Sequence, residues 1–254
     1  MDLTLASYNI HSGIGTDSKF DLHRIADVIR ETNADVIALQ EVGDFAGRTA
    51  SEAHPEDLAA LLGMHMAYGP NVVREGRRYG NAILSRLPIV KTKNYDISVE
   101  QKEPRGALRA DLDAGGGGLL HVFNVHLGLS TKERRRQEAL LLSADILRDA
   151  TRPDPVIVCG DFNYWLNGPV PSMVRSAIRD AAHILHHGER TYPSRFPMLR
   201  LDRMFVDQKV QPFSLHAHRS PAARIASDHL PLVMRFRTVR PEQPHAHFPA
   251  QIVA

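Results

Sequence analysis

The sequence contains very little cysteine. A single cysteine, Cys159, stands among 254 residues, so no internal disulfide can form and the fold does not depend on an oxidising compartment. One thiol also excludes the cysteine clusters of structural zinc sites, and no HExxH motif offers a histidine-rich zinc site. Because Cys159 lies in an apolar run, we interpret it as a small core residue rather than a nucleophile.

The sequence also lacks long hydrophobic runs and an excess of charge. No apolar run is long enough to span a bilayer, and the N-terminus lacks the basic and apolar regions of a signal peptide. We therefore expect a cytoplasmic protein with no integral membrane segment. Lysine and arginine total 31 against 29 aspartate and glutamate, a net charge of +2, so the overall charge neither favours nor excludes a nucleic-acid partner.

Short apolar runs typical of strands recur along the whole chain. Several alternate with polar residues at a period of two, and others are continuously apolar. The Gly-rich stretch at 114–118 separates two of these runs and predicts a hairpin loop. The runs predict strands at residues 3–10, 35–42, 80–86, 106–112, 119–127, 155–161, 201–207 and 230–236.

Helical patterns fall between these runs. Asp21 lies near the start of the first helix, and Ser130 or Thr131 is placed to cap the third, with Glu133 positioned for a capping box. Strands and helices are mixed, and some strand pairs have no helix between them, so the pattern favours an α+β layered domain over a pure Rossmann alternation. The predicted helices span residues 20–33, 55–64 and 130–150.

Polar side chains interrupt or follow several of the apolar runs. Each alone has an ordinary explanation, such as a turn, a solvated strand end or a hydrogen-bonded core histidine. Taken together, the residues are poorly explained in this way. An ionised carboxylate after a run such as Val-Ile-Val lies beside buried surface and requires a cation or a strong hydrogen-bond donor. Carboxylate and amide oxygens are the ligands that Mg²⁺ prefers, and histidines can donate to a phosphoryl oxygen. The residues concerned are Asn9, Glu41, His126, Asp161, Asn163, Asp202, Asp228 and His229.

The motifs that carry these residues resemble, in their order along the chain, those of the endonuclease/exonuclease/phosphatase superfamily. The matching segments are SYNIH (7–11), DVIALQEV (35–42), YGNAILSRLPI (79–89), EPRGAL (103–108), FNVHLG (123–128), GDFN (160–163), LDRMFV (201–206) and SDHLPL (227–232). The resemblance implies a four-layer α/β/β/α sandwich, in which two packed mixed β-sheets are flanked by helices, with the site at one end of the sheets. It also implies phosphoester hydrolysis that depends on a divalent metal, Mg²⁺ or Mn²⁺. We assign residues 1–237 to this catalytic domain and residues 238–254 to a C-terminal tail.

The resemblance further implies roles for the residues around the metal and the attacking water. Glu41 resembles the principal metal ligand and Asp228 a second carboxylate on the metal side. Asn9 resembles a residue that contacts the metal region or the scissile phosphate. Asp161 resembles the carboxylate that orients or deprotonates the attacking water, with Asn163 beside it on the phosphate.

The remaining motif positions surround the phosphate. His229 resembles the histidine next to the phosphate, Asp202 resembles the acid that orients this ring, and His126 resembles a second histidine. Arg105 and Asn81 occupy matched positions and are candidates for substrate binding. A strand-end ion pair for Arg105 and a turn for Asn81 are the alternatives.

The sequence leaves the substrate open. The segment 188–200 interleaves arginines with Tyr192 and Phe196, which suits stacking on bases or binding a phosphate beside an apolar group, and is equally explained as a structured surface loop. Three hypotheses remain: a phosphodiesterase acting on nucleic acid, the same chemistry on a phospholipid or small phosphoester, and an inactive binding scaffold. The complete ligand set argues against a scaffold, and we expect the protein to act as a monomer.

Overall fold

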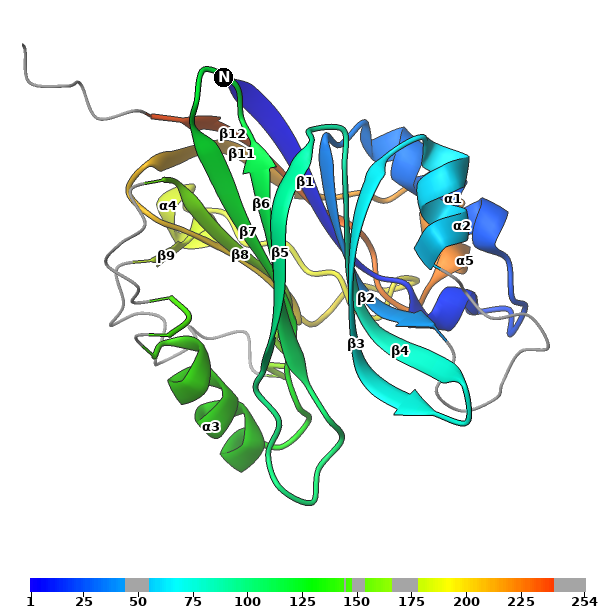
Figure 1. The fold of residues 1–254 in the computed structure, drawn as a ribbon. Coiled ribbons are helices and arrows are strands. Elements are labelled where there is room, and N and C mark those ends of the chain that lie inside the picture. The colour runs from blue at the N-terminus through cyan, green and yellow to red at the C-terminus, as the bar shows by residue number, and fades with distance from the viewer. Residues whose placement is uncertain (44–54, 144, 148–153, 166–177, 240–254) are drawn as a thin grey trace, which may run out of the picture.

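Two six-stranded sheets lie face to face in the computed structural model, which describes residues 1–43, 55–143, 145–147, 154–165 and 178–239 (Figure 1). In spatial order, the first sheet consists of β11 (Val210–Ala217), β12 (Leu232–Thr238), β1 (Asp2–Asn9), β2 (Val36–Gly43), β4 (Arg77–Ser85) and β3 (His65–Arg74). The second sheet consists of β5 (Ile89–Asp96), β6 (Gly106–Asp113), β7 (Leu119–His126), β8 (Val156–Asp161), β10 (Asp202–Val206) and β9 (Arg179–Asp180).

Both sheets are mixed. β1 pairs in parallel with β2, and β7 pairs in parallel with β8, whereas the other neighbours are antiparallel. The β6–β7 pair is a hairpin closed by the predicted Gly-rich loop. All eight strands that the sequence predicts are present, and β3, β5, β9 and β11 are additional.

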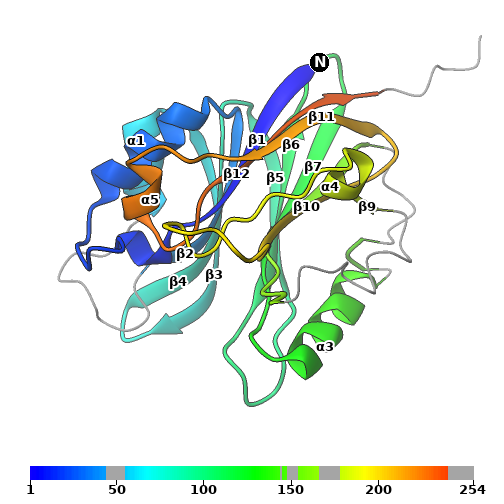
Figure 2. The ribbon, with the colours of Figure 1, turned by 180° about the vertical axis from the view of Figure 1, so that it is seen from behind.

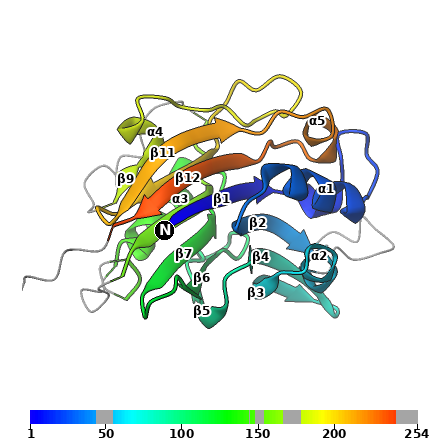
Figure 3. The same ribbon diagram turned by 90° about the horizontal axis from the view of Figure 1, so that it is seen from above.

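Helices cover the outer faces of the sandwich (Figure 1 and Figure 2). α1 (Leu22–Thr32), α2 (Pro55–Leu62) and α5 (Ala223–Ala226) pack on the outer face of the first sheet, as the view from above also shows (Figure 3). α3 (Thr131–Leu141) lies on the outer side of the second sheet, and α4 (Ala181–Ile184) packs against β10 and β11. The four-layer α/β/β/α sandwich is confirmed. No helix in the described part of the chain combines the length and apolar character needed to cross a membrane.

Side chains cap the starts of two helices, and the cap of α3 was predicted. Asp21 accepts a hydrogen bond from the backbone N of Arg24 at 2.9 Å and caps α1. The Ser130 hydroxyl accepts from the backbone N of Glu133 at 3.3 Å and caps α3. α3 ends at Leu141, however, and the described residues that follow, 142–143 and 145–147, are not helical, so the prediction of a helix through 147 is wrong.

This early end of α3 has a packing reason. Leu141, Leu142 and Ile146 all belong to the cluster on the outer face of the second sheet. A turn closed by a bond from the backbone N of Leu147 to the carbonyl of Leu141 brings these side chains down together. The rest of the predicted helix includes 144 and 148–150, which lie outside the described residues, as do 240–254 of the predicted tail. The domain boundary at 237 stays a prediction.

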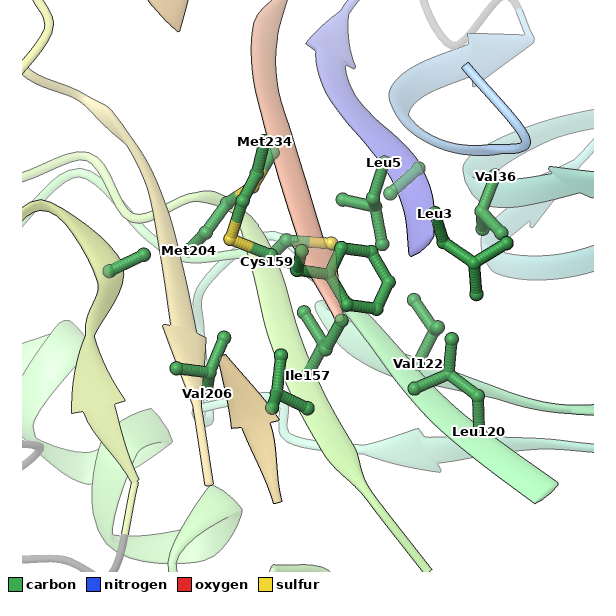
Figure 4. Close-up of a cluster of buried hydrophobic side chains, with 14 of the residues drawn as sticks. Leu3, Leu5, Val36, Leu120, Val122, Ile157, Cys159, Met204, Val206 and Met234 are labelled. Carbon is green, nitrogen blue, oxygen red and sulfur yellow. The ribbon is translucent and has the colours of Figure 1, made fainter. Parts of the chain in front are cut away.

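The space between the sheets is apolar for most of its length. Leu3 and Leu5 of β1 face this space and meet side chains such as Val122, Ile157 and Cys159 from the second sheet (Figure 4). Cys159 is a buried core residue, as predicted. Strand side chains alternate with a period of two, so the next inward positions of β1 are Ser7 and Asn9. The filling between the sheets therefore turns polar where β1 ends, beside the ends of β2, β7 and β8.

Candidate active site

A β-bulge brings Glu41 to this polar end of the sandwich. The pairing of β2 with β4 shifts between Leu39 and Val42, so that Gln40 and Glu41 together face one residue of β4. Glu41 has a φ of 56° there, a conformation that costs energy for a residue other than glycine and that bulges accommodate. Regular alternation would place consecutive side chains on opposite faces, and the bulge lets both reach residues of the second sheet.

Asn9, at the end of β1, ties Glu41 to Asp161 at the end of β8. Its Nδ2 donates to Oε1 of Glu41 at 2.9 Å and to Oδ2 of Asp161 at 3.1 Å. Its Oδ1 accepts from the backbone N of His11 at 3.1 Å. Both ends of the amide are therefore engaged, and carboxylates from two different sheets share a single amide donor. In this arrangement Asn9 holds the carboxylates in place, and its predicted role as a metal ligand stays a prediction.

His229 completes a chain of contacts that begins at Thr191. The Thr191 hydroxyl donates to Oδ2 of Asp202, and Nδ1 of His229 bonds the same oxygen at 2.9 Å. The predicted contact between Asp202 and His229 is thus present. Nε2 of His229 then lies 3.7 Å from Oδ2 of Asp161. Burial alone would lower the pKa of His229, but the charges of Asp202 and Asp161 raise it to about 10, so the ring is an imidazolium at neutral pH.

His126 approaches the same oxygen from β7 in the opposite protonation state. Nη1 of Arg105 lies 2.9 Å from its Nδ1, and since a guanidinium only donates, Nδ1 accepts and the proton resides on Nε2. That Nε2 is 3.7 Å from Oδ2 of Asp161 and 4.0 Å from Oε1 of Glu41. Burial, followed by the charges of Arg105 and His229, holds the pKa of His126 well below 6.5. The neutral ring therefore presents an N–H group to the site.

Asp161 lies at the centre of these contacts. It is 1% exposed, and burial raises its pKa to about 6, although the charge of His229 opposes this. Its Oδ1 accepts from the backbone N of Asn163 at 2.8 Å. A buried carboxylate whose pKa lies this close to neutrality can be either protonated or ionised under physiological conditions, as acid–base chemistry requires.

The oxygen atoms around Asp161 suit a hard divalent cation that binds the protein through only a few ligands. No group of three or more His, Cys, Asp or Glu side chains is placed to hold a metal within the described ranges. Mg²⁺ needs no such cage, because it keeps several waters and binds through one or two carboxylates. Glu41 and Asp161 supply two carboxylates that share one amide hydrogen-bond donor, and a cation would relieve the repulsion between them.

The other predicted residues border this cluster. Asn163 donates through Nδ2 to the carbonyl of Leu127 at 2.8 Å. Asp228 precedes His229, and its charge contributes to the raised pKa of that ring. Asn81 donates to the carbonyl of Gly106 at 3.1 Å, so its amide bridges the two sheets. The contacts of Asn163 and Asn81 with substrate and the role of Asp228 as a metal ligand stay predictions.

Residues 6–229 match the Endonuclease/Exonuclease/phosphatase family. The chain belongs to this family. Over an alignment of 260 residues it is 34% identical to the protein YbhP of Escherichia coli K12. The alignment covers 96% of this chain and 93% of YbhP.

Solved structures of the family share the fold. An endonuclease/exonuclease/phosphatase from Beutenbergia cavernae superposes with a TM-score of 0.74 at 24% identity, covering 95% of this chain and 73% of that one. The mannosyl-6-phosphatase of Bacteroides thetaiotaomicron gives a TM-score of 0.73 at 19% identity, covering 92% of this chain and 99% of that one. At these identities the likeness concerns the fold.

Within this family member, sequence patterns missed several residues that shape the site. Tyr79 hydrogen-bonds Glu41, and burial followed by the charge of Glu41 raises the pKa of its hydroxyl. Gln40 donates to Oδ1 of Asn124 at 2.7 Å across the gap between the sheets. Both lie inside matched motifs, one residue from a predicted strand boundary or ligand. The sequence shows that each residue lies in a matched motif, and this was the signal that could have found it. The sequence does not show which residue on another strand each one contacts.

Proposed function

We propose that this protein hydrolyses phosphoesters with the help of Mg²⁺ or Mn²⁺. The observation that carries the proposal is the surroundings of one oxygen, Oδ2 of Asp161. Nδ2 of Asn9 lies 3.1 Å from it, and the Nε2 atoms of His126 and His229 each lie 3.7 Å from it. One carboxylate that can accept a proton and two ring N–H donors of different charge suit attack of water on a phosphate, where negative charge builds on the phosphoryl oxygens.

The side chains divide the work in this proposal. Asp161 orients the attacking water and accepts its proton. His229, kept charged by Asp202, offsets the charge that develops on the phosphoryl oxygens. His126, kept neutral beside Arg105, donates a hydrogen bond without adding a charge. A phosphoryl group between the two rings would be oriented by both donors.

The metal would be held by Glu41 and its neighbours. When bound, a divalent ion polarises the phosphoryl oxygen and stabilises negative charge in the transition state. The oxygen donors favour Mg²⁺ or Mn²⁺ over a thiolate-preferring metal. Family membership supports phosphoester chemistry.

A chelation experiment tests the proposal. We expect purified protein to hydrolyse bis-p-nitrophenyl phosphate in Mg²⁺ or Mn²⁺, to lose this activity in excess EDTA, and to regain it when metal is restored. Plasmid DNA, single-stranded oligonucleotide and phospholipid vesicles assayed in parallel separate nucleic-acid, lipid and small-ester substrates. Undiminished hydrolysis in chelator would rule out the metal, and no hydrolysis of any substrate in either metal would favour the binding scaffold.

The variant Glu41→Ala tests the metal ligand itself. Removing one of two neighbouring carboxylates relieves repulsion in the metal-free protein, so its melting temperature should hold or rise while Mg²⁺ affinity measured by calorimetry falls. Glu31→Ala is the matched control, because Glu31 bonds His218 on the surface of the first layer. A large loss of stability in Glu41→Ala would instead make Glu41 a structural residue.

A further inference from the structure

Three rings follow one another outward from Asp161. The ring of Tyr192 lies 5.0 Å from the ring of His229, measured between centroids, at an interplanar angle of 52°. The ring of Trp165 lies 6.0 Å from that of Tyr192 at 79°, an edge-to-face contact. We refer to Tyr192 and Trp165 as the aromatic shelf. The shelf adjoins His229, the side chain that faces the phosphate in the proposed function.

The backbone holds Tyr192 firmly in this place. Residues 191–199 fold back on themselves, and the backbone N atoms of Leu199 and Met198 each donate to the carbonyl of Tyr192 at 2.8 Å. Two further bonds join this hairpin to the segment that carries His229: Ser194 N to Asp228 O at 2.7 Å and Leu230 N to Thr191 O at 2.9 Å. The backbone position of Tyr192 beside the segment that carries His229 is therefore fixed by hydrogen bonds.

Trp165 forms the outer part of the shelf. It follows Asp161 by four residues and is 48% exposed, which is unusual for the largest apolar side chain. An edge-to-face contact covers the edge of one ring and leaves ring surface free for another partner. Burial, followed by the charges of Asp228 and Asp161, raises the pKa of the Tyr192 hydroxyl, which places the shelf within electrostatic range of both carboxylates.

Two arginines of the segment 188–200, Arg195 and Arg200, are engaged elsewhere. Nη2 of Arg200 contacts Oδ1 of Asp180 at 2.5 Å, and Nε of Arg195 donates to the Thr16 hydroxyl at 3.2 Å. Of the arginine and aromatic pattern noted in the sequence, Tyr192 borders the candidate site. At this border Tyr192 offers ring packing, whereas Arg195 and Arg200 are held by other partners.

We propose that the aromatic shelf binds a ring of the substrate, so that the physiological substrate is a phosphoester whose alcohol carries a nucleobase or sugar ring close to the scissile phosphate. The inference rests on the proposed function, because it needs the phosphate beside His229. Nucleobases stack on indole and phenol faces, and sugar rings pack on them through C–H groups. An acyclic alcohol such as glycerol offers neither surface.

Fluorescence gives a direct test, because Trp165 is the only tryptophan of the chain. Stopped-flow emission is recorded on mixing the Mg²⁺-loaded protein with adenosine 5′-monophosphate, mannose 6-phosphate or glycerol 3-phosphate, and the initial amplitude is read before turnover. We expect a saturable change with at least one ring-bearing ester and none with glycerol 3-phosphate. A change with mannose 6-phosphate indicates a site for a sugar ring, and a change with adenosine 5′-monophosphate alone indicates a site for a nucleoside. Equal changes with all three esters, or no change with any, would overturn the inference.

Kinetics of Trp165→Ala provide the second test. Loss of one ring contact should raise KM for ring-bearing esters about tenfold, leave kcat within about twofold, and leave KM for the acyclic ester unchanged. Trp165→Phe should restore most of the affinity. Phe196→Ala is the matched control, since Phe196 belongs to the same hairpin and is 77% exposed. Equal increases in KM for ring-bearing and acyclic esters would contradict a ring site.

Failure of this inference and failure of the proposed function give different results. If chelator-sensitive hydrolysis is present but Trp165→Ala treats ring-bearing and acyclic esters alike, the shelf has no role in selection while the chemistry stands. If no ester is hydrolysed but ring-bearing ligands alone still change Trp165 emission, the shelf binds rings in a protein that does not perform the proposed reaction.

Discussion

Replacing Asp202 by Asn keeps the shape of the side chain and removes its charge. Oδ2 of Asp202 accepts from Thr191 and bonds Nδ1 of His229 at 2.9 Å, so an amide oxygen can preserve the geometry. The pKa of His229, which burial would lower, is raised to about 10 first by Asp202 and then by Asp161. In Asp202→Asn we therefore expect this pKa to fall back toward 6.5, so that the ring loses its charge near neutral pH.

The size of the effect follows from the same values. Raising a histidine pKa from 6.5 to about 10 corresponds to roughly 5 kcal/mol at about 1.36 kcal/mol per pH unit, shared among Asp202, Asp161 and Asp228. Because the folded pKa is above the unfolded one, the share of this stability that comes from Asp202 is fully present below pH 6.5 and is lost as the pH rises toward 10. The metal-free wild type should therefore lose stability across this range, and Asp202→Asn should lose much less.

Activity gives the second readout. A charged donor that acts mainly in the transition state should affect kcat more than KM, and we expect kcat of Asp202→Asn to fall about 10²-fold. NMR titration of the His229 ring checks the pKa. The double variant with His229→Ala should be little worse than His229→Ala alone, because the two residues act as a unit.

The chain supplies a matched control for this experiment. Asp111 bonds Nδ1 of His121 at 2.7 Å on β6 and β7, so Asp111→Asn removes the same kind of charge from another buried histidine. It should alter stability without lowering kcat by more than about twofold in the folded fraction. If the losses from Asp202→Asn and His229→Ala multiply, the two residues act independently and the reasoning is refuted.

Two further predictions concern the neighbours of this pair. Burial raises the pKa of Asp161 from 3.8 to about 6, so ionisation of Asp161 costs stability as the pH rises through this range. Asp161→Asn should therefore stabilise the metal-free protein by roughly 3 kcal/mol at pH values above about 7, and by little below pH 3.8. Thermal melts in EDTA at both extremes check this, and an equal gain at both would contradict it. Arg105→Met should free Nδ1 of His126 and lower kcat about tenfold, and ¹⁵N shifts of the ring should show a mixture of tautomers; an unchanged Nε2–H tautomer would exclude the role of Arg105.

The strands that the sequence predicts are the interior strands of both sheets, and the four that it misses are the edge strands β3, β5, β9 and β11. An interior strand has neighbours on both sides and buried faces, so its apolar run is long and visible. Edge strands remain partly in water and carry polar residues or proline. β5 is exposed over most of its length, β11 contains Pro212, and β9 has only two residues.

The candidate site follows the same physical division. The strand-end positions of Asn9 and Asp161 could be predicted, because a polar residue that follows an apolar run can be recognised in the sequence alone. Their shared hydrogen bonds with Glu41 could not, since they depend on a bulge and on the packing of one sheet against the other. Arg105 illustrates the limit: the sequence offered substrate binding or an ion pair, and the structure pairs it with Glu103 at 3.2 Å and also with His126.

The interior location of the strands that carry Glu41, His126 and Asp161 has a consequence for how the protein loses activity. A central strand can separate from its sheet only by breaking the hydrogen bonds to both neighbouring strands at once. The amide protons of such strands therefore exchange with solvent mainly when the whole protein unfolds. Heat or denaturant should therefore not separate Glu41, His126 and Asp161 from one another while the two sheets remain folded. We therefore expect loss of the proposed activity and global unfolding to occur together, with the same midpoint.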